Sequence, residues 1–436
     1  MCSSDPKDTF PAAEYLFSLR SRGAKYGIER MQAFVQALGH PEREYPVIHV
    51  AGTNGKGSTC AMLDSILRKS GAKVGMLTSP HLVQLGERIQ VDRQVTSNQE
   101  IADFVEFLKP VADELGQGNT AAAPSFFEMI TAMGFLLFAR EKVDVAIVET
   151  GLGGRLDATN VVHPILSIIT SIGFDHVAQL GNDLSSIATE KGGVIKNKVP
   201  VVVGCMPESA KTTIQALANK RQSRVFDVEA AFPEAPEDLP QTNLEGAFQR
   251  WNAASAQVAS LALKQRFGLT ESLVSEALRE VEWEGRWQCL QVNGRRLILD
   301  ATHNEEGARS LDDNFAKLVN RLEKKPWVLT GTLGEERASP LMEVVAKWAR
   351  GIVLLRPNQP RACPFDVLER AVPKTFSGEL ARSTLDELFS DEGKLDFGNT
   401  GDTLVVTGSI YLLGEVLARV KGRSVHRGLD ALQDWV

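Results

Sequence analysis

A glycine-rich stretch that contains one lysine, residues 52–59, is the part of the sequence best suited to chemistry. Glycines allow the backbone to bend so that successive N–H groups face one point, and a helix that begins there adds positive potential. Lys56 could reach the β- and γ-phosphates of a nucleotide, and the hydroxyl of Ser58 or Thr59 could bind Mg²⁺. The residues expected to contact the nucleotide are Gly52, Thr53, Asn54, Gly55, Lys56, Gly57, Ser58 and Thr59.

The spacing within this stretch departs from the common phosphate-loop pattern G-x-x-x-x-G-K-[ST]. Only two residues separate Gly52 from Gly55, and Gly57 follows the lysine. A glycine-rich turn without a ligand is therefore the alternative. The order of strand, loop, lysine and helix favours phosphate binding over that alternative.

Two acidic residues lie at the ends of apolar runs that are typical of strands. Glu149 follows the run 143–148, and Asp300 lies near the end of the run 297–301. Ligands of α/β domains bind outside the carboxyl ends of strands, so both carboxylates are candidates for the site. A carboxylate beside a phosphate loop can hold Mg²⁺, although Glu149 could instead only cap the loop that follows it.

Short apolar runs alternate with amphipathic stretches along the chain, which predicts an α/β protein with mostly parallel sheets. The expected strands are 46–51, 74–77, 143–148, 165–170, 199–203, 297–301, 327–330, 352–355 and 403–407. The expected helices are 57–70, 126–139, 184–196, 244–263, 305–322, 340–350 and 410–420. A new cycle of strands and helices begins near residue 296, so we expect two domains, residues 1–290 and 291–436.

The composition supports a globular protein that acts on small molecules. A chain of 436 residues is too long for one ordinary core, and a net charge of −7 argues against a nucleic-acid partner. The five cysteines are dispersed and form no CxxC pair, which suits a reducing compartment. The sequence shows no signal peptide and no apolar run approaching the roughly 20 residues of a membrane span. We therefore expect a cytoplasmic protein without a membrane partner.

Further motifs occur in a fixed order along the chain. VAGTNGKGS resembles the shortened phosphate loop of Mur-type ligases, and the glycine after the lysine resembles the branch of bifunctional folylpolyglutamate synthase and dihydrofolate synthase. The motifs that are similar to this branch are TSPHL (78–82), GERI (86–89), SFFE (125–128), ETGLGGRLDATN (149–160), TSIGFDH (170–176), ATEKGGVIK (188–196), LEGAFQRWNA, WEGRWQ, LDATHN and VVTGSIYL. The resemblance spans roughly residues 14–420.

The resemblance implies a P-loop NTPase-like N-terminal domain with the pteroate or folate pocket and a smaller Rossmann-like C-terminal domain that ligates glutamate. It also implies ATP and two Mg²⁺ sites, one near Ser58 and one held by Ser79, Glu149 and His176. Lys56, Lys191 and His176 would be catalytic, and Lys191 would be carbamylated. Considered alone, Lys191 could be a solvated lysine, and His176 could be a surface partner of Asp175.

The resemblance also implies further contacts with the nucleotide and with the pteroate or folate. The implied nucleotide contacts are Asn252, Arg286, Asp300 and His303, and the implied pteroate or folate contacts are Phe127 and Asp157. The chain departs from the family pattern at Phe248, Gly192, Thr302 and the loop Glu335-Glu336-Arg337. The last departure leaves any role for that loop open.

The activity implied is ATP-dependent ligation. The carboxylate of dihydropteroate or of a folyl-glutamate would be activated as an acyl phosphate and joined to L-glutamate by a monomeric enzyme. One alternative is polyglutamylation of folates alone. Others are another Mur-type amino-acid ligase, a kinase, or a regulatory P-loop ATPase. A cell-wall ligase would need a further N-terminal domain, and only about 45 residues precede the loop, too few for a typical domain.

Overall fold

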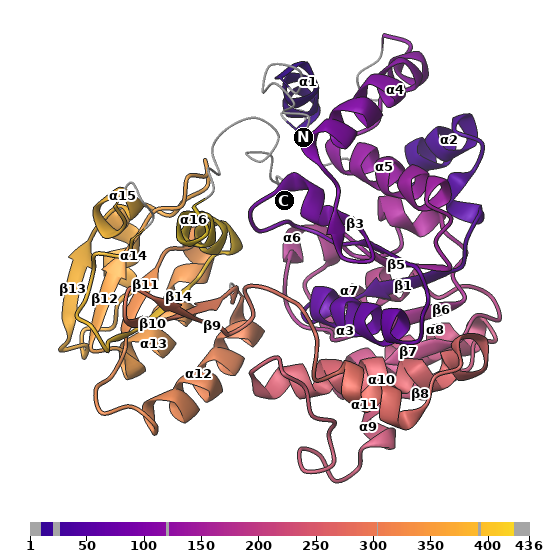
Figure 1. Ribbon diagram of the computed structural model, residues 1–436. Coiled ribbons are helices and arrows are strands. Elements are labelled where there is room, and N and C mark those ends of the chain that lie inside the picture. Colours follow the sequence, from indigo (N-terminus) through magenta and orange to yellow (C-terminus); the bar gives the residue numbers. More distant parts are fainter. Residues whose placement is uncertain (1–9, 21–26, 119–121, 303, 391–393, 423–436) are drawn as a thin grey trace. The chain divides into compact units, whose positions relative to one another are not determined.

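A computed structural model describes residues 10–20, 27–118, 122–302, 304–390 and 394–422 (Figure 1). Within these residues the chain forms two compact units. The first unit comprises the described residues up to Asn243 together with Arg250–Glu282, and the second comprises Leu244–Gln249 together with the described residues from Trp283 onward. Each unit is built around one sheet, and the predicted α/β class is confirmed.

The sheet of the first unit has eight strands in the order β4-β3-β2-β5-β1-β6-β7-β8. Parallel pairing joins β2, β5, β1, β6, β7 and β8 in that order. Strands β3 and β4 add an antiparallel edge beside β2. Their bounds are β1 (Val47–Ala51), β2 (Val74–Leu77), β3 (Ile89–Val91), β4 (Gln94–Val95), β5 (Val145–Glu149), β6 (Leu166–Ile169), β7 (Val201–Val203) and β8 (Val225–Asp227). The central strands β1, β5 and β6 are buried along their whole length, as apolar runs covered on both faces should be.

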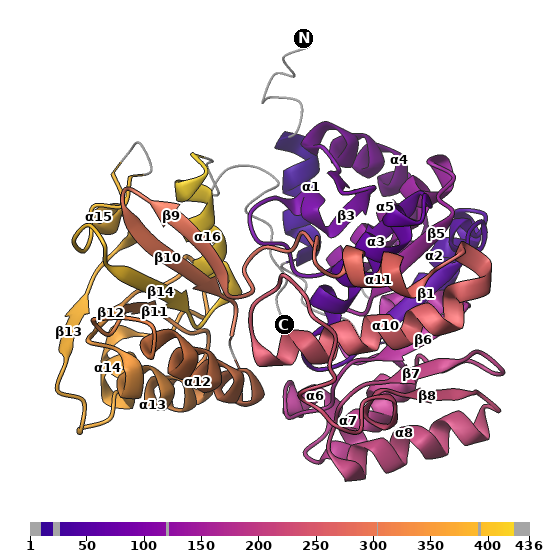
Figure 2. The same ribbon diagram turned by 60° about the horizontal axis from the view of Figure 1, so that its bottom comes forward.

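Helices cover both faces of this sheet. In Figure 1, α5 lies above the strands and α3 below them, and Figure 2 shows α8 beside β7. The helices are α1 (Phe10–Arg20), α2 (Glu29–Ala37), α3 (Lys56–Lys69), α4 (Asn98–Gly116), α5 (Phe126–Arg140), α6 (Val177–Leu180), α7 (Leu184–Gly192), α8 (Glu208–Lys220), α9 (Val228–Ala231), α10 (Ala247–Phe267) and α11 (Glu271–Ala277), with 3₁₀ turns η1 (Pro41–Arg43), η2 (Leu85–Arg88) and η3 (Ala158–Val161). Apolar residues of α1, α2, α4 and α5 form one core with β1, β2 and β5.

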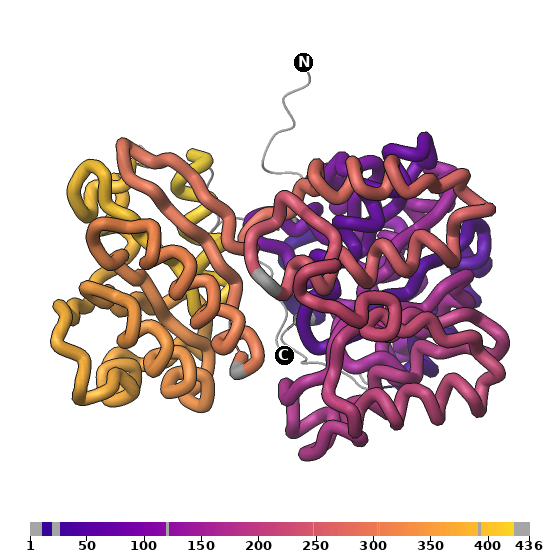
Figure 3. The backbone as a smooth tube through the Cα atoms, turned by 90° about the horizontal axis from the view of Figure 1, so that it is seen from below, coloured from indigo at the N-terminus to yellow at the C-terminus, as the bar shows by residue number. Residues whose placement is uncertain are grey.

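The sheet of the second unit has the strand order β13-β12-β11-β14-β10-β9. All neighbours pair in parallel except β9, which is antiparallel to β10. The strands are β9 (Gln288–Val292), β10 (Arg295–Asp300), β11 (Trp327–Thr330), β12 (Gly351–Leu354), β13 (Glu379–Arg382) and β14 (Thr403–Thr407). The helices are α12 (Glu305–Val319), α13 (Ala338–Trp348), α14 (Phe365–Ala371), α15 (Leu385–Leu388) and α16 (Ile410–Val420), with a 3₁₀ turn η4 (Glu335–Arg337). Helices α12 and α13 lie side by side (Figure 3).

The helix expected over residues 184–196 is too long. Helix α7 ends at Gly192, and Gly193 follows as its C-cap residue. Glycine is a weak helix former, and a Cβ at Gly193 would lie 2.4 Å from the Cα of Arg155. The close approach of the loop at Arg155 therefore requires the glycine that ends the helix.

The expected domain boundary at residue 290 falls within β9. That strand pairs with β10, so residues 288–292 belong to the second sheet. In the described part of the chain, no helix is both long enough and apolar enough to cross a membrane.

Candidate active site

The glycine-rich loop lies between β1 and α3 and takes a backbone path that only glycine allows. Gly52 has φ of 155° and Gly55 has φ of 83°. A Cβ on Gly52 would lie 2.0 Å from Thr170 Oγ1, and a Cβ on Gly55 would lie 2.2 Å from Asn252 Oδ1. The loop is therefore closely packed, and side chains at these two positions would displace it.

Residues that follow β6 hold the loop in place. The Thr53 N–H donates to Ser171 O at 2.8 Å, and the Asn54 N–H donates to Ser171 Oγ at 3.0 Å. The Thr170 hydroxyl donates to Asn54 O at 2.6 Å, and the Thr53 hydroxyl donates to Gly173 O at 3.1 Å. Because β6 is a parallel neighbour of β1, the carboxyl ends of both strands meet at one edge of the sheet.

Two lysines converge on the carbonyl oxygen of Gly52. Lys56 Nζ donates to Gly52 O and to Thr53 O, each at 3.2 Å. Lys191 Nζ donates to Gly52 O at 2.8 Å, and its residue is only 4% exposed. Lys56 gives the loop the positive charge that a bound polyphosphate requires, and the Lys191 side chain lies directly beside it.

Glu149 lies on the other side of the loop, at the end of β5. Its Oε1 lies 3.9 Å from Lys56 Nζ, and its Oε2 accepts a hydrogen bond from the Ser79 N–H at 3.2 Å. Glu149 and Ser58 are both buried. Carboxylate and hydroxyl oxygens are hard donors, so this set fits Mg²⁺.

The structure does not place His176 in a cluster of side chains that could bind a metal ion together. It has φ of 49° before α6, and its Nε2 lies 3.8 Å from Asp175 Oδ1. Across the described ranges, no three His, Cys, Asp or Glu side chains are placed to share a metal ion. An ion here would therefore depend on hydroxyl, phosphate and water oxygens as well as on Glu149.

Four other predicted nucleotide contacts of the first unit differ in their exposure. Asn252, on α10, is buried against Gly55 of the loop. Gly57 and Ser58 lie in the first turn of α3. Thr59 is fully buried, its N–H donates to Gly55 O within the helix, and its hydroxyl has no hydrogen-bond partner among the described residues. The structure thus offers Thr59 less access to a nucleotide than its neighbours.

The two predicted pteridine contacts lie close to the same sheet edge. Phe127 is half-buried near the start of α5, and its ring lies against Gly151, where a Cβ would be 2.6 Å from the ring. Asp157 precedes η3 and is buried, and its burial raises the pKa of this carboxyl. Its Oδ2 accepts a hydrogen bond from the Leu152 N–H at 2.8 Å, so Asp157 also shapes the loop that follows Glu149.

The carboxylate of Asp300 is occupied by the backbone of its own unit. Its Oδ2 accepts from the Trp287 N–H at 3.2 Å, and its Oδ1 accepts from the Thr302 N–H at 3.1 Å. It thereby holds the turn that carries Arg286, which is half-buried. His303, the remaining predicted nucleotide contact, lies outside the described residues.

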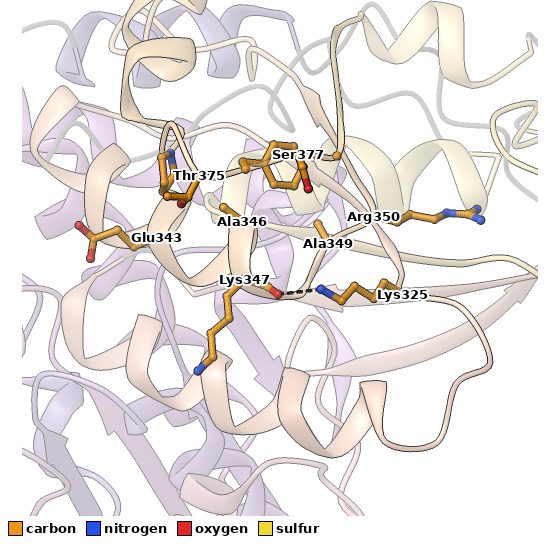
Figure 4. Close-up of a pocket in the computed structure, with 11 residues that line it drawn as sticks. Lys325, Glu343, Ala346, Lys347, Ala349, Arg350, Thr375 and Ser377 are labelled. Atoms are coloured by element: carbon orange, nitrogen blue, oxygen red, sulfur yellow. Dashed lines mark hydrogen bonds between the residues drawn. The ribbon is translucent and has the colours of Figure 1, made fainter.

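A pocket of about 650 Å³ in the second unit has basic residues in its lining (Figure 4). Lys325 and Arg350 precede β11 and β12, so the pocket lies at the amino ends of these strands. Lys325 donates to Lys347 O, and Arg350 pairs with Asp402. Ligands of open parallel sheets bind at the carboxyl ends instead, and these cations already have partners. The pocket is therefore not the candidate site.

Several residues of the site were missed by the reasoning from sequence. Thr170 and Ser171 lie within the motif TSIGFDH, but no role was assigned to them. His49 and Thr159 form a buried hydrogen bond of 2.8 Å beside Asp157. A polar residue inside an otherwise apolar strand, VIHVA, was the signal that could have indicated His49.

Comparison with known proteins agrees with this geometry. The profile of the Mur ligase middle domain matches residues 50–245. The dihydrofolate synthase/folylpolyglutamate synthase of Bacillus subtilis is 33% identical over 423 residues, which cover 92% of this chain and 96% of that protein. This chain belongs to the dihydrofolate synthase/folylpolyglutamate synthase family.

Solved structures support the assignment to this family. The folylpolyglutamate synthase of Thermotoga maritima has a TM-score of 0.79 and 31% identity, with coverage of 94% of this chain and 97% of that one. Escherichia coli FolC in complex with DHPP and ADP has a TM-score of 0.78 and 28% identity, with coverage of 96% and 98%. The predicted family and the predicted class of ATP-dependent ligase are confirmed.

Proposed function

We propose that this synthase has both activities of its family. It joins L-glutamate to dihydropteroate and also extends folyl-glutamates, in each case at the expense of ATP. The observation that carries the proposal is the convergence of Lys56, Lys191 and Glu149 on the glycine-rich loop. The Bacillus subtilis relative is named for both activities, and the Escherichia coli neighbour was solved with DHPP and ADP.

The chemistry follows from the charge of the reactants. A carboxylate is a poor electrophile because it is anionic, and transfer of the γ-phosphoryl group to it gives an acyl phosphate. The two anions repel each other, so the site must neutralise charge as they approach. Lys56 and the N-terminus of α3 do this in the loop. The amine of glutamate then attacks the acyl carbon, and phosphate leaves.

Mg²⁺ is the metal that fits the oxygen donors near the loop. Ser58 would hold one ion, and Ser79, Glu149 and His176 would hold a second. The ions supply charge neutralisation on the phosphate oxygens when they are bound. Carbamylation of Lys191 would add an anionic group beside them, and an intact-mass measurement that shows the addition of one CO₂ tests it.

Recognition of the pteridine is assigned to Phe127 and Asp157. An aromatic ring offers a stacking face to a flat heterocycle, and a carboxylate accepts hydrogen bonds from amidine-like N–H groups. Polyglutamylation without dihydrofolate synthase activity is the second candidate. It is favoured by relatives named only for polyglutamylation, such as the Lacticaseibacillus casei enzyme, which is 29% identical.

Other assignments complete the proposal. The second unit would supply Arg286, Asp300 and His303 to the nucleotide and would act in glutamate ligation. The enzyme would work as a monomer in the cytoplasm, without nucleic-acid or membrane partners. Dispersed cysteines and the net charge of −7 support the cytoplasmic location and the absence of a nucleic-acid partner.

The experiment is an ADP-release assay with dihydropteroate or tetrahydrofolate, with and without L-glutamate. We expect ADP formation that depends on both the pteridine and glutamate. Activity with tetrahydrofolate but not with dihydropteroate would show that the enzyme only polyglutamylates folates. ADP release that requires neither substrate would contradict the ligase assignment.

A further inference from the structure

His49 is a polar residue inside the strand that ends in the glycine-rich loop. It lies in the middle of β1 and is fully buried. Its Nε2 lies 2.8 Å from Thr159 Oγ1, and Thr159 Oγ1 lies 2.5 Å from Asp157 Oδ1. A continuous chain of hydrogen bonds therefore joins β1 to the carboxylate that we assign to pteridine recognition.

The direction of each hydrogen bond follows from a proton count. The Thr159 hydroxyl has one hydrogen, and the carboxylate of Asp157 takes it. Thr159 Oγ1 must then accept from His49, so the proton of the imidazole resides on Nε2. His49 Nδ1 has no hydrogen-bond partner within the described ranges, and burial lowers the pKa of His49 to about 3. His49 is therefore a neutral and permanent donor at physiological pH.

Asp157 also receives hydrogen bonds from two backbone groups. The Thr159 N–H donates to Oδ1 at 3.0 Å, and the Leu152 N–H donates to Oδ2 at 2.8 Å. These three donors restrict the rotation of the carboxylate, and they lower its pKa in opposition to the burial that raises it. An anion that is held in one orientation can accept hydrogen bonds from a ligand at its remaining lone pairs.

We propose that His49 and Thr159 are positioning residues for the pteridine. They orient Asp157 as an acceptor for the N–H groups of the heterocycle, and they connect that acceptor to the strand that leads into the phosphate loop. This inference rests on the proposed function, because it takes Asp157 to be a substrate contact.

The decisive variants remove the hydroxyl or the imidazole donor. Thr159→Val should raise KM for dihydropteroate about tenfold, because a charge-assisted hydrogen bond to Asp157 is lost. The values of kcat and of KM for ATP should change less than about twofold, and Thr159→Ser should restore the wild-type KM. His49→Leu should raise the same KM about threefold, and His49→Gln, which keeps an N–H donor, should restore it.

A role in folding alone would give a different result. It would lower the melting temperature and the fraction of active enzyme, but it would leave KM for dihydropteroate unchanged. Ser167→Ala is the matched control, because it removes another buried hydroxyl of the first unit, one that donates to Val194 O. If Thr159→Val does not fold, the comparison of His49→Leu with His49→Gln carries the same test.

Asp157→Asn distinguishes the positioning role of His49 and Thr159 from the proposed contact of Asp157 with the pteridine. If it raises KM for dihydropteroate while Thr159→Val and His49→Leu do not, the positioning role is wrong and the proposed function stands. If Asp157→Asn leaves KM unchanged, Asp157 does not bind the pteridine and the inference falls with that assignment. If tetrahydrofolate is the only pteridine accepted, the same variants are measured with it. If the wild-type enzyme turns over neither pteridine, the proposed function itself is wrong.

Discussion

Strand β1 of the first unit and strand β10 of the second unit each lead into proposed nucleotide contacts. The residues at their carboxyl ends are nevertheless arranged differently. Strand β1 lies between two parallel neighbours, β5 and β6, and each contributes residues beside the glycine-rich loop. Strand β10 has one parallel neighbour, β14, because β9 on its other side is antiparallel. The carboxyl end of β9 therefore lies at the opposite edge of the sheet.

The difference shows in what each carboxylate does. Glu149 lies near a lysine of the loop and near Ser79, so it can act on a ligand. Asp300 accepts hydrogen bonds from Trp287 and Thr302 of its own unit, so it mainly holds a turn. A loop flanked by two parallel strands can receive functional groups from both sides, whereas the loop after β10 has a parallel neighbour on one side only, where the Gly408 N–H after β14 donates to Thr302 O.

Replacement of Lys56 should have the largest effect on activity. Lys56→Ala should reduce kcat by about 10³-fold, because it removes the cation that neutralises the transferred phosphoryl group. ADP release with dihydropteroate and glutamate measures it. Lys69→Ala is the control, because Lys69 lies at the other end of α3 and pairs with Glu280. Retained activity in Lys56→Ala would remove the loop from the mechanism and with it the difference between the two regions.

Glu149→Gln should reduce activity by about 10²-fold and raise the Mg²⁺ concentration required for half-maximal rate. The amide keeps the shape of the side chain but removes the negative charge that attracts the ion. A titration of the rate with MgCl₂ measures the change. Glu141→Gln, at a half-buried residue that pairs with Lys73, is the matched control. An unchanged Mg²⁺ requirement would argue against Glu149 as a metal ligand.

Asp300→Asn should reduce activity less than Glu149→Gln does. The amide cannot accept from both backbone N–H groups, and the loss of one hydrogen bond to a charged group should lower stability by about 1.5–3 kcal/mol. We expect a lower midpoint of thermal unfolding together with a loss of activity of about tenfold or less. Asp313→Asn, at an exposed position of α12, is the control. A loss of activity as large as that of Glu149→Gln, at unchanged stability, would show that the two carboxylates act alike.

Of these substitutions, His49→Gln should have the smallest effect on activity. It should be visible only as a change in the pH dependence of stability. The folded pKa of His49 is about 3, below the unfolded value of about 6.5, so only the unfolded chain gains the proton as pH falls between these values. Wild-type stability should therefore fall from pH 6.5 downward more steeply than that of His49→Gln, by up to about 1.4 kcal/mol per pH unit.

Thermal unfolding between pH 4.5 and pH 6.5 measures the two slopes. His40→Gln is the control for loss of a histidine outside the core, since its side chain is 31% exposed and faces Glu42. Equal slopes for the wild type and His49→Gln would contradict a neutral, buried imidazole in β1.

The sequence by itself determined the local elements around the site. The alternation of apolar runs and glycines placed β2 at its observed bounds and α3 within one residue at each end, and it placed Glu149 at the end of a strand. Such features depend on hydrophobic periodicity and on the conformational freedom of glycine, which operate over a few residues. Helix α7 was expected to continue to residue 196, because the close approach of Arg155 at Gly193 is not visible in a local pattern.

Only the tertiary structure decided which distant residues meet at the loop. Asn252 lies against Gly55, Thr170 holds Asn54, and His49 reaches Thr159. These contacts depend on the strand order β2-β5-β1-β6, which is not the order of the strands along the chain. Local propensity sets where a strand begins and ends, but the packing of whole elements sets which strand becomes its neighbour. The hydrogen bonds that hold the phosphate loop and Asp157 are consequences of that packing.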